Sequence, residues 1–136
     1  MMTIRSMRRS GNTAITNAET VDDYYTKSRL ERENMYSQMI ESYQKIIDKT
    51  NASESQKQSA QKEITKINEQ KNAIMIAENL LKNKNFPDVI IFINNESINV
   101  VVKTKKLETE QVAKIQNIVT REFKANITNI HISTKE

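Results

Sequence analysis

The sequence predicts an α+β protein: a long N-terminal helix, followed by a helix–strand–strand–helix–strand unit whose two helices pack on a three-stranded sheet. Two observations favour this class. The densest apolar run, residues 89–93, is followed by a polar link and a second β-branched run, residues 98–102, as in a β-hairpin. Apolar residues at helical spacing lie both before and after this hairpin.

Three regions follow along the chain. Residues 1–19 hold three arginines and the only glycine without any periodicity, which favours a disordered arm or a leader foreign to the native chain. Residues 20–50 form the first helix, because Thr20 is a hydroxyl N-cap and Asp22-Asp23 place carboxylates in the first turn. Residues 53–136 form the compact domain.

The first helix is expected to end near Asp48 and to be longer than its own core. Its first half holds only Leu30 as a clear apolar residue, so that half is solvated unless a partner covers it. The apolar stripe of the second half comprises Tyr36, Met39, Ile40, Tyr43, Ile46 and Ile47.

The second helix is expected to start at a capping box of Ser53 and Gln56 and to end before Pro87. It is polar early and broadly apolar late, which indicates that its C-terminal end enters the core. Its thin apolar seam comprises Ala60, Ile64, Ile67, Ile74 and Leu81.

The third helix and the last strand complete the sheet unit. Gln111 fits N3 of a helix that ends near Phe123, and the alternation in Ile127–Ile132 predicts the last strand. A right-handed crossover places this helix on the same sheet face as the end of the second helix. Turns that need positive φ must use Asn, with Asn94-Asn95 and Asn83/Asn85 as candidates.

The composition argues against an enzyme. There is no cysteine, and His131 is the only histidine, so thiol chemistry, catalytic triads and multi-histidine metal sites are excluded. No phosphate-binding loop is present, and the paired carboxylates at residues 22–23 and 108–110 sit where helix starts favour acids. We therefore expect no catalytic, cofactor-binding or metal-binding residue, and no cofactor.

Charge and hydropathy leave the compartment open. No run approaches the roughly 18 apolar residues of a membrane span, so the chain is either cytosolic or an ectodomain separated from its anchor. The net charge of +4 and the cluster of Lys103, Lys105 and Lys106 permit a small nucleic-acid-binding fold as a rival. No nucleic acid is expected as partner, because the GXXG clamp and exposed aromatic residues of such folds are missing.

From about Thr20 to Lys135 the chain resembles the soluble domain of the stage III sporulation protein AH family. The likeness lies in the order, the spacing and the chemical character of the residues over most of the chain. It is carried by residues 21–33 (VDDYYTKSRLERE), by the approach from Ile74 to Val89, by the strand at 98–103 (INVVVK) and by residues 110–123.

The resemblance implies a ring-building-motif-like fold and a non-enzymatic role in the mother cell–forespore channel complex of sporulating bacteria. Implied partners are the ectodomain of SpoIIQ, a forespore membrane protein, other stage III sporulation A-operon proteins, and copies of the chain in an oligomeric ring. It implies an anchor in the outer forespore membrane, absent from this chain, with this domain in the intermembrane space. A docking adaptor that never oligomerises is the alternative.

We expect binding through a surface. A three-stranded sheet has two edges, and an exposed edge can accept a partner strand. The expected interface combines the underfilled start of the first helix with the last strand, and its residues are Tyr24, Tyr25, Leu30, Asn129, His131 and Ser133. The two tyrosines can instead pack on the body of the domain. If they face a partner, replacing both with Ala leaves the melting temperature nearly unchanged.

Overall fold

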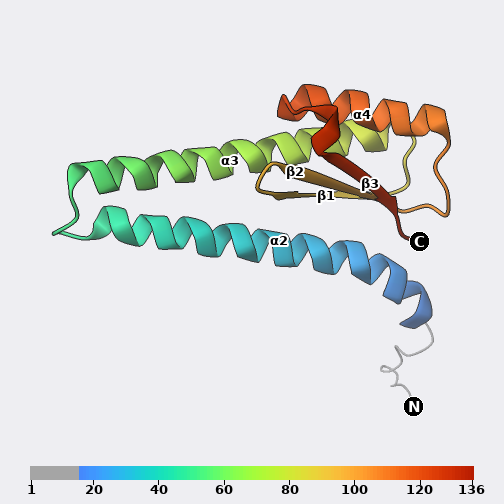
Figure 1. Ribbon diagram of the computed structural model, residues 1–136. Helices are drawn as coiled ribbons and strands as arrows, with labels where there is room; N and C mark the ends of the chain where they lie inside the picture. The colour runs from blue at the N-terminus through green and yellow to red at the C-terminus, as the bar shows by residue number, and fades with distance from the viewer. Residues whose placement is uncertain (1–15) are drawn as a thin grey trace, which may run out of the picture.

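The computed structural model describes residues 16–136, with side chains from Tyr24 onward. Three helices and a three-stranded sheet make up this part (Figure 1). In chain order they are α2 (Thr16–Asp48), α3 (Glu54–Asn83), β1 (Val89–Asn94), β2 (Ser97–Val102), α4 (Thr109–Phe123), the 3-10 helix η2 (Ile127–Asn129) and β3 (Ile130–Thr134). The predicted α+β class is confirmed.

Helices α2 and α3 form an antiparallel hairpin whose connected end projects beyond the sheet (Figure 1). The predicted capping box starts α3: the Gln56 N–H donates to Ser53 Oγ at 3.1 Å, and the Ser53 N–H donates to Gln56 Oε1 at 3.0 Å. Helix α2 begins at Thr16, so the predicted start at Thr20 is four residues late. Most of the predicted arm, residues 1–15, lies outside the described residues.

The strands are ordered β1-β2-β3, so β1 and β3 are the two edges. Strands β1 and β2 are antiparallel, with Ile91 opposite Val100, and Asn95 takes the predicted positive φ of 59° in the connecting turn. Strands β2 and β3 are parallel, with α4 in the crossover between them.

The last strand was predicted too early. Residues 127–129 form η2 because the Asn126 side chain accepts a hydrogen bond from the Thr128 N–H at 3.1 Å and turns the chain before it can extend. The strand then runs from Ile130 to Thr134, and the Lys135 N–H donates to the Val102 carbonyl oxygen at 2.9 Å. Asn129 therefore lies in η2 and not on the strand.

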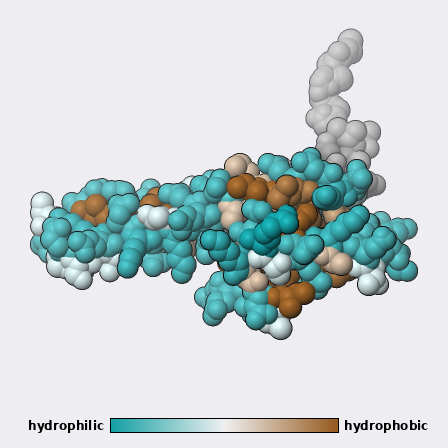
Figure 2. All heavy atoms as spheres, turned by 90° about the horizontal axis from the view of Figure 1, so that it is seen from above, coloured by the Kyte–Doolittle hydropathy of each residue, from teal (hydrophilic) through white to brown (hydrophobic). Residues whose placement is uncertain are grey.

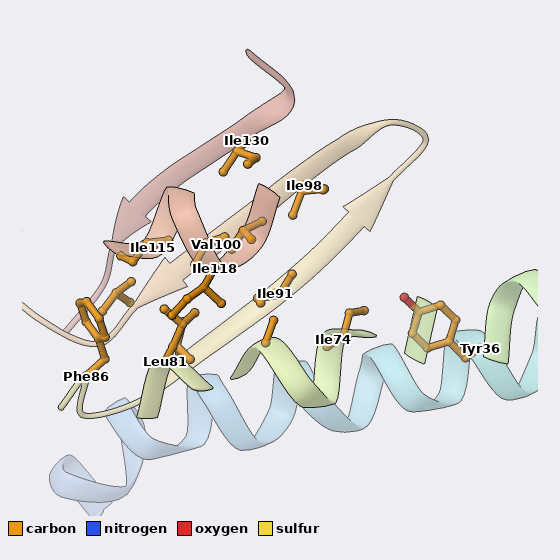
Figure 3. Packing of buried hydrophobic residues seen from close by; sticks show 14 of the residues in the cluster. Tyr36, Ile74, Leu81, Phe86, Ile91, Ile98, Val100, Ile115, Ile118 and Ile130 are labelled. Atoms are coloured by element: carbon orange, nitrogen blue, oxygen red, sulfur yellow. The ribbon is translucent and has the colours of Figure 1, made fainter. Parts of the chain in front are cut away.

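The main core lies between one sheet face and the helices α3 and α4 (Figure 3). As predicted, α3 enters it near its C-terminal end, where Ile74 and Leu81 are buried against Ile91 and Ile115. Each such aliphatic side chain contributes roughly 1.5–3 kcal/mol by leaving water. The packing holds the sheet rigidly and so fixes the position of both edges.

Helix α2 is more than an appendage. It packs along α3 and contacts β1, with Arg29 beside Asp88 at the start of β1 and Tyr25 beside Lys135 just after β3. Because these two contacts lie at opposite sides of the sheet, the start of α2 crosses the end of the sheet. On the other face of β1, Ile90 is fully buried and Phe92 is half-buried.

Candidate protein-docking surface

The outer edge of β1 is closed by side chains at Val89 and Ile91. Backbone groups alternate in direction along a strand, and those of Val89 and Ile91 point away from β2. The Ile91 N–H donates to Glu78 Oε2 at 2.9 Å, and the Ile91 carbonyl oxygen accepts from Arg32 Nη1 at 2.7 Å. One acidic and one basic side chain thus take the place of a neighbouring strand.

The outward backbone groups of Val89, two residues before Ile91, are bonded by side chains in the same way. Its carbonyl oxygen accepts a hydrogen bond from Arg29 Nη2 at 2.8 Å, and its N–H donates to Asp88 Oδ1 at 2.9 Å. Arg29 Nη2 also donates to Asp88 Oδ1 at 2.6 Å. We call the four residues Arg29, Arg32, Glu78 and Asp88 the edge cap.

Each carboxylate of the edge cap is stabilised in its charged form by a neighbouring arginine. Glu78 is only 8% exposed, and its Oε2 lies 2.8 Å from Arg32 Nη1. An ionised carboxylate so deeply buried would be very costly without this partner. Burial alone would raise the pKa of Asp88, but the Arg29 hydrogen bond, the Val89 N–H and the charges of Arg29 and Lys82 hold that pKa below its usual value.

The β3 edge differs, because no side chain bonds its outward groups in the described part of the chain. Since the Lys135 N–H points to Val102 on β2, the backbone groups of Ile132 and Thr134 point away from β2. The side chains of His131, Ser133 and Thr134 are exposed. This edge can accept hydrogen bonds from a further strand.

The sequence-predicted interface residues separate into different places. His131 and Ser133 lie on β3, and Asn129 is half-buried just before it. Leu30 is 61% exposed on α2. It follows Tyr24 by six residues, which at about 100° per residue leaves the two roughly 120° apart, so they share no face.

The tyrosine pair anchors α2 to the end of β3. Tyr25 is 1% exposed, and its hydroxyl donates to the Lys135 carbonyl oxygen at 2.7 Å. Burial is the main cause that raises the pKa of Tyr25 to about 12, and the neighbouring Tyr24 and Asp88 add smaller contributions. The half-buried Tyr24 packs edge-on against Tyr25 at 5.0 Å, with Lys135 Nζ over its ring. Tyr25 is therefore an internal contact, whereas Tyr24 remains partly accessible beside β3.

Sequence reasoning missed the edge cap, although a signal was present. Arg29 and Arg32 share a helical stripe with the buried Tyr25 and Tyr36, at spacings of four, three and four residues. Glu78 likewise falls inside the buried stripe of α3, between Ile74 and Leu81. A charged residue inside a buried stripe indicates a partner of opposite charge.

Two further surface features lie at the end of the helical hairpin and over the sheet. A hollow of about 550 Å³ lies near the connected ends of α2 and α3, lined by residues such as Tyr43 and Ala60. Across residues 16–136 we find neither a cluster of possible metal ligands nor a helix apolar enough to cross a membrane. Seen from above, apolar surface gathers over the half that holds the sheet and α4, whereas the projecting hairpin is mostly hydrophilic (Figure 2).

These features define a small α+β domain with a projecting helical hairpin, one closed sheet edge and one open edge. The chain belongs to the SpoIIIAH-like protein family, whose model matches residues 5–132.

Two known proteins are similar to it. Stage III sporulation protein AH of Bacillus subtilis (strain 168) is 26% identical over 103 residues, which cover 76% of this chain and 47% of that protein. The chain thus spans about half the length of this relative. A chain in the solved structure of the SpoIIQ-SpoIIIAH pore forming complex matches with a TM-score of 0.71 and 23% identity, over 82% of this chain and 95% of that one. At that identity the likeness establishes the fold.

Proposed function

We propose that this protein is a non-enzymatic structural component of the mother cell–forespore channel complex, and that it docks the SpoIIQ-type ectodomain through the β3 edge. Membership of the SpoIIIAH-like family supports the class of complex. The observation that carries the docking site is the contrast between the edges: Val89 and Ile91 are closed by the edge cap, while Ile132 and Thr134 point outward.

The proposed interface is centred on β3. A partner strand laid beside it would bond the outward backbone groups of Ile132 and Thr134. Asn129, His131 and Ser133 supply polar contacts around this line, and Tyr24 adds a partly exposed aromatic ring next to Lys135. Tyr25 contributes by holding α2 in place. Leu30, on another flank of α2, would contact a different neighbour, such as a second copy in a ring.

The cellular setting belongs to the same proposal. The domain would lie in the intermembrane space, held by an anchor in the outer forespore membrane. Other stage III sporulation A-operon proteins and further copies of the chain would complete an oligomeric ring. A complex that forms with SpoIIQ and never grows further would favour the adaptor role.

The test is light scattering after size exclusion, on the protein alone and mixed with the SpoIIQ ectodomain. The variant Thr134→Pro removes one outward N–H from an exposed position, so we expect at least a tenfold loss of affinity at unchanged fold. Thr134→Ala keeps that N–H and serves as the matched control, with affinity retained. Equal binding by both variants would contradict docking through β3.

A further inference from the structure

Strand β1 has the composition of a strand that pairs with copies of itself. Its residues, Val-Ile-Ile-Phe-Ile-Asn from Val89 to Asn94, include no charge, proline or glycine, and it is an edge strand. An uncharged, β-branched edge of this kind is a template for pairing with another chain unless something covers it.

The cover is supplied by the helices. The edge cap bonds both outward groups of Val89 and both of Ile91, which are four consecutive pairing positions of the edge. Arg29 and Arg32 come from α2 and lie one turn apart, matching the spacing of Val89 and Ile91 along β1. Helix α2 runs beside this edge (Figure 1).

The bonds that α2 makes to the β1 backbone are polar, whereas the helix itself is also held by the buried Tyr25 and Tyr36. The Arg29–Asp88 pair is partly exposed, with side-chain exposures of 30% and 24%. Only the Arg32–Glu78 pair is nearly buried. Such a contact closes the edge with specific geometry. Replacing its polar groups frees the outward backbone groups of β1 and leaves the buried apolar residues of the main core unchanged.

We propose that the first half of α2 is an autoinhibitory lid over a latent pairing edge, and that without the edge cap β1 pairs with β1 of a second copy. A second copy is the fitting occupant because two identical uncharged strands pair antiparallel about a two-fold axis, which closes the assembly at a dimer. The lid thereby leaves β3 as the sheet edge open to other chains. This inference does not depend on which partner binds β3.

The test replaces three of the four residues of the edge cap by apolar groups. In the variant with Arg29→Ala, Arg32→Leu and Glu78→Leu, no buried charge is left unpaired, yet Ile91 loses both of its hydrogen-bond partners. Light scattering is expected to show a dimer that is at least tenfold tighter than any self-association of the unchanged protein. Amide exchange should place new protection at Ile91 and Ile93.

A matched control adds Phe92→Lys, which sets like charges against each other across a β1–β1 pair and should restore the monomer. If the triple variant does not fold, Arg32→Leu with Glu78→Leu keeps the Arg29–Asp88 pair, still removes both hydrogen bonds to Ile91, and gives the same readout. A folded cap variant that stays monomeric would overturn the proposal, as would a dimer that survives Phe92→Lys. Loss of SpoIIQ binding alone would bear on the β3 docking site and not on the lid.

Discussion

The two edges of the sheet differ in whether side chains bond their outward backbone groups. At β1, the backbone groups of Val89 and Ile91 are bonded by Arg29, Arg32, Glu78 and Asp88. At β3, the corresponding groups of Ile132 and Thr134 point outward, flanked by exposed polar side chains. The more apolar strand is therefore the covered one, and the more polar strand is the accessible one.

This difference leaves one edge of the sheet available for a further strand. A closed edge cannot add a strand, so under the proposed function a neighbour docks at the open edge. The closing groups come from α2 and α3, which means that the helical hairpin does more than extend the domain. It decides which edge is available.

The largest effect is expected from breaking the buried pair of the edge cap. Arg32→Ala leaves the Glu78 carboxylate buried without its cation, which should cost about 3–5 kcal/mol in the free energy of unfolding. Urea denaturation measures this loss. Lys45→Ala is the control, since the Lys45–Glu41 pair is exposed and 3.9 Å long, and its removal should be close to neutral. Equal effects in both variants would contradict a stabilising cap.

Removing Tyr25, which anchors α2 at the end of β3, should lower the free energy of unfolding slightly less than Arg32→Ala does. Tyr25→Ala deletes a buried ring and its hydrogen bond to Lys135, with an expected loss of about 3 kcal/mol. Tyr24→Ala, on a half-buried ring, should cost under about 1 kcal/mol and should weaken docking at β3. Thermal unfolding compares the two variants. Similar melting temperatures would favour the alternative in which both tyrosines face a partner.

The outer pair of the edge cap should give a smaller effect than Arg32 or Tyr25, and one that depends on pH. Arg29→Ala should cost about 1–2 kcal/mol, because the pair with Asp88 is partly exposed. Since the pKa of Asp88 is lowered in the folded state, this stability is present above its usual pKa near 4 and is lost as the pH falls through the lowered value.

Denaturation at pH 7 and near pH 2 checks this sign. The unchanged protein and Arg29→Ala should differ at pH 7 and converge in acid. Asp88→Asn is the control, because an amide does not titrate in this range. A difference that stays constant down to pH 2 would contradict the ion-pair account.

The sequence predicted the fold well where apolar pattern decides it. The hairpin, the core end of α3, the capping box at Ser53 and the positive φ at Asn95 all followed from local rules. The start of β3 was missed because the alternation at 127–129 is overridden by the Asn126 side chain, which caps a turn.

The candidate site was harder to predict, because its main feature is polar and long-range. Arg29 and Arg32 meet Asp88 and Glu78 across 59 and 46 positions of sequence. A search for apolar residues at helical spacing counts such charged residues as solvent-exposed. The first half of α2 was therefore predicted to have too few apolar residues to pack on the domain. For the same reason the sequence left open whether Tyr25 faces a partner or packs on the domain; its hydroxyl bonds Lys135 at the far end of the chain.

The most direct measurement is residue-resolved amide hydrogen exchange, on the protein alone and bound to the SpoIIQ ectodomain. We expect the Ile132 and Thr134 amides to gain protection on binding, because they point outward from β3 and would bond the partner strand. The Ile91 amide, already bonded to Glu78, should not change. A complex that protects β1 or the α2–α3 hairpin and leaves Ile132 and Thr134 unchanged would contradict docking through the open edge.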